Sequence, residues 1–153
     1  MATTPARIAK HPIHPMLVVL PLGLWIAALA FDIVYAITSA PVWRTLAFWN
    51  IAAGIIGALL AAVPGFVDYL DLDGRARRIA TYHMVLNLAA VALFAVNWYV
   101  RTRVPANSSW PLVLSVIGVV GVIVSGWLGG ELVYRERVGV EEEPRSERYR
   151  RVA

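Results

Sequence analysis

Three histidines and two acidic residues are the side chains of this chain that could bind a metal ion or a haem iron. His11 and His14 belong to a His-Pro-Ile-His-Pro motif, and His83 follows much later. Asp68 ends a Gly-Phe-Val-Asp motif and Glu131 ends a Gly-Gly-Glu motif. Imidazole is an axial ligand of haem iron, and imidazole together with carboxylate suits Zn, Fe or Mn. The chain has no Cys, which excludes disulfides, thiolate metal sites and Cys nucleophiles.

No motif of the chain identifies an enzyme class. It contains no glycine-rich phosphate loop, no His-Glu-x-x-His and no Gly-x-Ser-x-Gly. The sequence therefore leaves open whether the protein is an enzyme. The net charge of +4 could suggest a nucleic-acid partner. However, the basic residues flank apolar segments, which favours a role in membrane orientation and predicts no nucleic-acid partner.

The charged residues are distributed too unevenly for a water-soluble domain. Of the 153 residues, 59% are hydrophobic and 16% are charged, whereas soluble domains have about 25% charged residues. Between residues 15 and 67 the charged residues are Asp32 and Arg44, and between 79 and 134 they are Arg101, Arg103 and Glu131. Such long stretches cannot present a charged face to water, so the chain is predicted to be a multi-pass membrane protein with the lipid bilayer as its surroundings.

Each charge-poor stretch is long enough for two membrane spans of about 20 residues, with a Pro-containing break between them. The predicted fold is an all-α integral membrane four-helix bundle made of two transmembrane hairpins. Its predicted parts are an N-terminal segment (1–15), a four-helix domain (16–134, with spans 16–36, 43–67, 79–100 and 110–134) and a charged, mobile tail (135–153).

The Lys and Arg residues predict the orientation in the membrane. With four spans, both termini and the middle loop share a side, and that side carries eleven of the fourteen basic residues. The other side carries Arg44, Arg101 and Arg103, which we expect at the edges of the outer loops. The positive-inside rule then places both termini in the cytoplasm and the protein in the inner (cytoplasmic) membrane.

Polar and small residues recur at helical spacing in all four spans, which predicts inward-facing stripes. Two of the stripes are polar and the other two consist mainly of small residues that permit close backbone approach. In chain order, the stripes are His14, Val18, Pro21, Trp25 and Asp32; Asn50, Gly54, Gly57, Ala61, Gly65 and Asp68; His83, Asn87, Phe94 and Asn97; and Gly118, Gly121, Ser125 and Gly129.

The predicted topology brings all three histidines and two acids to one end of the bundle. His14 and His83 open the first and third spans, while Asp68 and Glu131 close the second and fourth. Each hairpin therefore opens with a His and closes with an acid, which suggests a degenerate internal duplication. The prolines after His11 and His14 are expected to keep both histidines out of the helical conformation.

These motifs also carry a family resemblance. The His-Pro-Ile-His-Pro motif with Leu-Pro-Leu-Gly-Leu, the Gly-Phe-Val-Asp motif with His83 and Asn87, and the closing Gly-Trp-Leu-Gly-Gly-Glu-Leu-Val-Tyr segment resemble a bacterial membrane-protein family known as domain of unknown function 2231. The resemblance extends over about residues 11–140. It implies a four-helix integral membrane protein and no particular activity.

The most specific functional hypothesis is a small b-type haem subunit for electron transfer or redox sensing. His14 and His83 would be the haem ligands, because parallel spans hold them at the same depth. Neighbouring glycines could admit the flat macrocycle. A redox partner or a homo-oligomer would accompany such a subunit.

Two other hypotheses remain open. One is a metal site formed by His11, His14, Asp68, His83 and Glu131. The other is a cofactor-free membrane scaffold, or a small transport-type subunit whose pathway follows polar residues of the first and third spans. The transport pathway would comprise His83, Asn87, Asn97 and Asp32.

Overall fold

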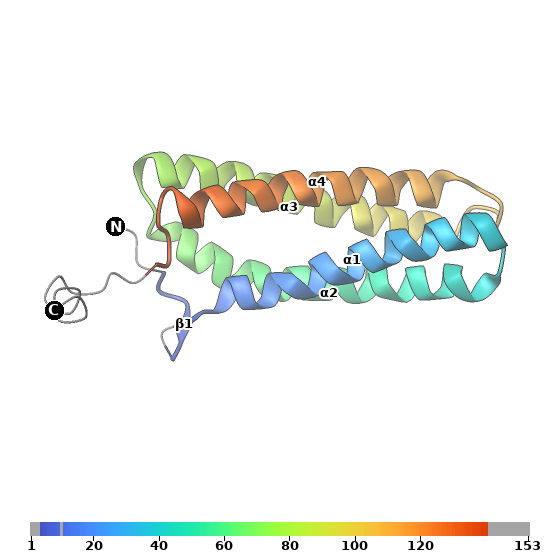
Figure 1. The fold of residues 1–153 in the computed structure, drawn as a ribbon, viewed down its shortest axis with the longest axis horizontal. Helices are drawn as coiled ribbons and strands as arrows, with labels where there is room; N and C mark the ends of the chain where they lie inside the picture. The colour runs from blue at the N-terminus through green and yellow to red at the C-terminus, as the bar shows by residue number, and fades with distance from the viewer. Residues whose placement is uncertain (1–3, 10, 141–153) are drawn as a thin grey trace, which may run out of the picture.

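The computed structural model describes residues 4–9 and 11–140. Four long helices form the body of the molecule, and a short β-hairpin precedes them (Figure 1). The hairpin pairs β1 (Arg7–Ile8) with β2 (His11–Pro12) in antiparallel register. The helices are α1 (Ile13–Thr38), α2 (Pro41–Leu70), α3 (Gly74–Arg101) and α4 (Trp110–Tyr134).

All four helices are long and apolar enough to cross a membrane, which confirms the predicted all-α membrane bundle. They contain between 25 and 30 residues. At 1.5 Å per residue their lengths are about 38–45 Å, compared with a hydrocarbon core of about 30 Å. Each helix includes the corresponding predicted span, and α1, α2 and α3 continue beyond it, while α4 has the predicted bounds. The helix ends therefore extend into the interfacial region.

The helices pack as two hairpins placed side by side. In Figure 1, α1 and α2 form one hairpin and α3 and α4 form the other. α1 packs against α2 and α4, and α3 packs against α4 and α2, so α1 and α3 face each other diagonally. We call the end with the β-hairpin and the α2–α3 connection the histidine end. The opposite end, with the α1–α2 and α3–α4 connections, is the hairpin end.

Local chemistry explains the breaks between the helices. α1 ends at Ser39, which has a left-handed φ of 56° and donates its backbone N–H to the Tyr35 carbonyl at 2.8 Å. Pro41 then begins α2, where its missing N–H costs nothing because the first helical turn has no intrahelical acceptors. The resulting link between α1 and α2 holds the two helices close together.

The N-terminal segment corrects one expectation about the histidines. His11 is in β2, as its following proline predicts, but His14 lies within the first turn of α1. The expectation that Pro15 keeps His14 out of the helix is therefore wrong. Because N–H groups in the first turn need no intrahelical acceptor, a proline at this point leaves the helix intact.

Residues 135–140, which follow α4, contact this N-terminal segment. These residues, the start of the predicted charged tail, form turns, and the Val138 N–H donates to the Leu132 carbonyl at 3.0 Å. A Cβ added at Gly139 would lie 3.4 Å from Pro12 and from Thr4. The two chain ends therefore cover the histidine end together. The rest of the predicted tail, residues 141–153, lies outside the described residues.

The bundle interior is narrow, and most large apolar side chains point outward, as expected for a surface that faces lipid. The central cluster contains Trp25, Ile51 and Phe94, each at most 3% exposed, with small residues around them. Trp25 and Phe94 stack across the bundle axis, with ring centroids 4.2 Å apart. Glycines of the partner helices, Gly54 under Trp25 and Gly118 under Phe94, provide the space for these rings.

Equivalent contacts relate the two hairpins by a fixed shift in sequence for each pair of helices, 69 residues from α1 to α3 and 64 from α2 to α4. Trp25 and Phe94 are 69 residues apart, as are His14 and His83, and the glycines beneath the aromatic rings are 64 apart. Since α1 and α3 run in the same direction, the hairpins are related by an approximate twofold axis along the bundle.

This register agrees with an internal duplication, but it does not pair Asp68 with Glu131, the two acids from which the duplication is suggested. With a shift of 64 between α2 and α4, Asp68 corresponds to Leu132 and Glu131 corresponds to Val67. Asp68 and Glu131 are therefore not equivalent positions. The equivalent pair at this end is Gly65 and Gly129, which contact His14 and His83 respectively.

The Trp25–Phe94 stack generates a stability prediction. In Gly118→Ala, the new Cβ would lie 2.7 Å from ring atoms of Phe94, which is fully buried and cannot move aside freely. We expect this variant to lose about 1–3 kcal/mol of unfolding free energy. Thermal unfolding in detergent, followed by the fluorescence of the six tryptophans, would measure the change.

Gly121→Ala is the matched control, because it lies in the same helix and a Cβ there meets no atom within 4 Å. Its stability should equal or slightly exceed that of the wild type, since Ala favours helix more than Gly does. Equal destabilisation by both substitutions would contradict the packing described here.

Candidate functional site

The histidine end brings two of the three histidines together across the bundle axis. The ring centroids of His14 on α1 and His83 on α3 are 6.3 Å apart, and the ring planes are nearly perpendicular at 88°. Both side chains are half-buried. The prediction that the two spans hold these histidines at the same depth is thus realised as a direct ring contact.

Each histidine is oriented by a backbone carbonyl of the other helix in its own hairpin. Nδ1 of His14 lies 2.8 Å from the Ala61 carbonyl oxygen, and Nδ1 of His83 lies 2.8 Å from the Ser125 carbonyl oxygen. A carbonyl oxygen only accepts hydrogen bonds, so Nδ1 carries the proton in both rings. In the neutral form of each ring, Nε2 then presents a lone pair.

The two Nε2 atoms have different surroundings. Nε2 of His83 accepts a hydrogen bond from the Asn87 side-chain amide at 2.9 Å, one helical turn further along α3. Among the described residues, no hydrogen bond is made to Nε2 of His14. The residue equivalent to Asn87 in the first hairpin is Val18, which has no polar group to offer. Nδ1 of His83 also lies 3.1 Å from the Ser125 hydroxyl, for which the equivalent Ala61 has no counterpart. The two rings therefore share the carbonyl contact at Nδ1 and differ in their other hydrogen bonds.

Glycines allow this close approach. A Cβ at Gly65 would lie 2.6 Å from Nδ1 of His14, and one at Gly129 would lie 3.2 Å from Cε1 of His83. Any side chain at Gly65 would displace the imidazole ring from the Ala61 carbonyl. Gly65 and Gly129, which belong to the small-residue stripes predicted on the second and fourth spans, thus leave space for the histidine rings.

The other residues proposed as metal ligands have partners of their own. Nδ1 of His11 lies 2.9 Å from the Ala9 carbonyl oxygen on the exposed β-hairpin. Asp68 accepts the Ala6 N–H at 2.9 Å, which fastens the N-terminal segment to α2. Glu131 accepts from Arg135 at 2.9 Å. Within residues 4–9 and 11–140, no three His, Asp or Glu side chains form a group that could hold a metal ion.

The hairpin end contains a buried ion pair. Arg101 and Asp32 form a bidentate interaction, with N···O distances of 2.8 and 2.5 Å, and their side chains are 1% and 4% exposed. Ser115 donates to Asp32 at 2.6 Å, and Asn97 accepts from Nε of Arg101 at 3.1 Å. No buried side-chain nitrogen or oxygen of the described residues lacks a hydrogen-bond partner.

The expected place of Arg101 at the edge of an outer loop is therefore wrong. Arg101 is the last residue of α3, and its side chain turns back into the bundle to reach Asp32. Arg44, which is also expected at these loops, lies in the first turn of α2. Its side chain donates to the Arg101 carbonyl at 2.8 Å. Arg103 is exposed, with its guanidinium over the Tyr99 ring.

The sequence identifies Asp32, Asn97 and both histidines as inward-facing, but it does not identify Arg101 and Ser115, the partners of Asp32. Arg101 follows Asp32 by 69 residues, the same interval that separates His14 from His83. This repeated interval was the signal that could have found the ion pair. Ser115 carried no such signal, because its equivalent position in the first hairpin is Ile51.

A family model described as "Predicted membrane protein (DUF2231)" matches residues 10–142. The matched range includes all four helices, the histidine pair and the ion pair. It confirms the family to which the motifs are similar. No curated protein and no solved structure matches the chain.

The ion pair leads to a second stability prediction. Arg101→Met leaves Asp32 buried without a countercharge, which should cost about 3–5 kcal/mol of unfolding free energy. In the double variant Asp32→Leu/Arg101→Met no charge is buried, so most of that stability should return. A double-mutant cycle of thermal unfolding in detergent measures the coupling.

Arg103→Met is the control for this cycle, since it removes an arginine two residues away that is exposed. It should leave the unfolding temperature nearly unchanged. If the double variant is as unstable as Arg101→Met, the unpaired buried charge is not the cause.

Proposed function

The chain belongs to the DUF2231 family of predicted membrane proteins, and for this member we propose that His14 and His83 bind one haem b in a small electron-transfer or redox-sensing subunit. The observation that carries the proposal is the pairing of these two imidazoles across the bundle axis, 6.3 Å between ring centroids. Both imidazoles would hold the haem iron, one from each hairpin.

The hydrogen bonds at Nδ1 support a ligand role. A metal-binding histidine commonly donates its other ring N–H to a carbonyl or carboxylate, which sets the tautomer and the ring orientation. His14 and His83 both do so, through the Ala61 and Ser125 carbonyls. The nitrogen left to bind iron is Nε2 in each ring.

The donor set favours haem over a zinc-type site. Structural and catalytic zinc sites take three or four protein ligands, whereas the iron of a haem already has four nitrogens from its macrocycle. The contact described here unites two imidazoles, while Asp68 and Glu131 are engaged with Ala6 and Arg135. His14 and His83 would hold the iron, and the haem would supply one-electron transfer with a redox partner.

Asn87 would have to move for His83 to act as a ligand. Its amide now donates to the Nε2 lone pair of His83, the atom that would face the iron. A rotation of the Asn87 side chain would free this nitrogen without changing the Ser125 hydrogen bond that orients the ring. Haem binding would therefore require the loss of the Asn87 hydrogen bond to Nε2 of His83.

A cofactor-free membrane scaffold is the second candidate function. It is favoured by the complete hydrogen bonding of the buried polar side chains in the described residues, including His83 through Asn87. The Trp25–Phe94 stack fills the centre of the bundle, which argues against a solute pathway along the axis of a single copy. In this case, the outward apolar faces would be the functional surfaces.

We also propose that the histidine end faces the cytoplasm. Arg75, Arg77, Arg78 and Arg135 lie at this end, on α3 and at the end of α4. The hairpin end carries Arg44, Arg101 and Arg103, and Arg101 is neutralised by Asp32. By the positive-inside rule, this asymmetry retains both termini in the cytoplasm.

The haem proposal predicts an absorption spectrum. Protein expressed under haem-replete conditions and purified in detergent should show a Soret band, with the sharpened visible bands of a six-coordinate haem after dithionite reduction. His14→Ala and His83→Ala should each abolish or strongly change these bands, because each removes one axial ligand.

His11→Ala is the control, because His11 is exposed and its ring is hydrogen-bonded within the β-hairpin. It should retain the wild-type spectrum. If folded wild-type protein has no Soret band after expression with excess haem, the haem proposal fails and the scaffold is favoured.

The orientation is testable because the chain has no native Cys. Single cysteines can be introduced at Asp73, in the α2–α3 connection, and at Asn107, in the α3–α4 connection. A membrane-impermeant maleimide should label Asn107→Cys in intact cells, and Asp73→Cys only after permeabilisation. The reverse pattern would place the histidine end outside.

A further inference from the structure

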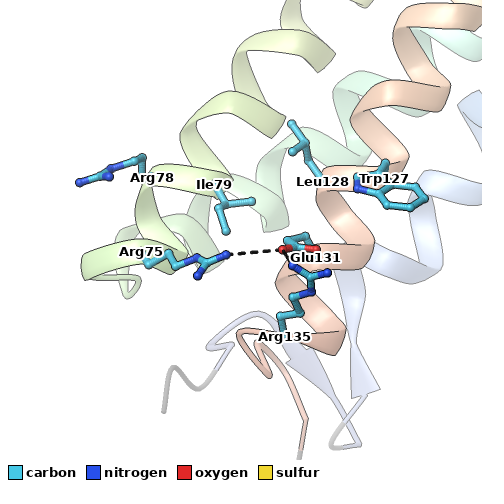
Figure 2. Close-up of a pocket in the computed structure, with 7 residues that line it drawn as sticks. All are labelled: Arg75, Arg78, Ile79, Trp127, Leu128, Glu131 and Arg135. Atoms are coloured by element: carbon cyan, nitrogen blue, oxygen red, sulfur yellow. Dashed lines mark hydrogen bonds and ion pairs between the residues drawn. The ribbon is translucent and has the colours of Figure 1, made fainter.

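An open pocket lies between α3 and α4 at the histidine end, away from the histidine pair. Its volume is about 520 Å³. Figure 2 shows the side chains that surround it, which come from the first turns of α3 and the last turns of α4. The lining residues are Arg75, Arg78, Ile79, Trp127, Leu128, Glu131 and Arg135.

The polar side of the pocket is predominantly basic. Three arginines line it with one acid, Glu131, which lies 2.9 Å from Arg135 and 3.6 Å from Arg75. Arg75 also pairs with Glu136 at 3.1 Å, which leaves Arg78 as the lining arginine without an acidic partner among the described residues. The Arg78 side chain extends outward at the rim in Figure 2. The pocket thus has an excess of positive charge, with guanidinium groups on two helices.

The other side of the pocket is apolar and faces outward. Ile79 lies one turn beyond Arg75 and directly follows Arg78, Leu128 lies about two turns before Arg135, and Trp127 is 76% exposed. Trp favours the boundary between headgroups and acyl chains. The pocket therefore has two sides. Guanidinium groups lie near the helix ends, and apolar side chains lie next to them toward the hydrocarbon.

We propose that this pocket binds the headgroup of an anionic phospholipid. The phosphate would lie against Arg78 and the arginines that flank Glu131, and an acyl chain would follow Ile79 and Leu128 down the α3–α4 surface. Basic pockets between transmembrane helices are known to select such headgroups. A soluble phosphate would gain nothing from the apolar wall, so the lipid is the ligand that uses both sides. The proposal does not depend on haem.

Native mass spectrometry of the full chain in detergent tests it, with phosphatidylglycerol and phosphatidylcholine as the titrated lipids. Wild type should bind phosphatidylglycerol more tightly. Arg78→Gln and Arg135→Gln should each weaken this binding about fivefold, the effect of removing one basic group near a lipid headgroup. Glu131→Gln should strengthen it, because this change removes the acid that pairs with Arg135, while Arg75 keeps its ion pair with Glu136.

Arg77→Gln is the matched control. Arg77 neighbours Arg78 and is also exposed, but its guanidinium stacks 5.0 Å from the Tyr69 ring, outside the pocket. Its affinity for phosphatidylglycerol should equal that of the wild type. The proposal is overturned if Arg77→Gln weakens binding as much as Arg78→Gln, if both lipids bind equally, or if inorganic phosphate displaces the lipid at millimolar concentration.

Discussion

The Asp32–Arg101 ion pair is the interaction on which the assembly of the two hairpins depends. A charged side chain buried within a membrane bundle is costly unless it is paired, and lipid provides no hydrophobic force that drives helices together. Neither hairpin alone can neutralise its own charge, because Asp32 is in the first and Arg101 in the second. Their contact requires α1 and α3 to face each other, and this arrangement also brings His14 to His83.

The internal repeat explains why the two ends of the bundle differ in chemistry. Three pairs of equivalent positions meet on the axis: His14 with His83, Trp25 with Phe94, and Asp32 with Arg101. The first pair is identical, the second is similar and the third has opposite charges. The supporting polar groups belong only to the second hairpin, since Asn97 and Ser115 correspond to Ala28 and Ile51. The histidine end thus pairs two identical residues, and the hairpin end pairs opposite charges across the two hairpins.

Charge distribution and helical spacing were sufficient to predict four membrane helices, the inward positions of Asp32 and Asn97, and the common depth of the histidines. They failed for Arg101, because an arginine at the end of a span has the same sequence context whether it extends into a loop or turns back into the bundle. They also failed for the acids of the supposed metal site. Residues at a common depth need not be in contact. Asp68 accepts a hydrogen bond from the N-terminal segment, and Glu131 accepts one from Arg135.

The histidine pair differs from the ion pair in what its surroundings require. Opposite charges at Asp32 and Arg101 satisfy each other, and hydrogen bonds from Ser115 and Asn97 complete the site, so it needs no ligand. An imidazole ring that donates from Nδ1 and carries no second proton presents an acceptor at Nε2, and two acceptors cannot bond to each other. Asn87 satisfies one of them, whereas the equivalent Val18 cannot satisfy the other. The haem that we propose would offer an electron-pair acceptor to these nitrogens.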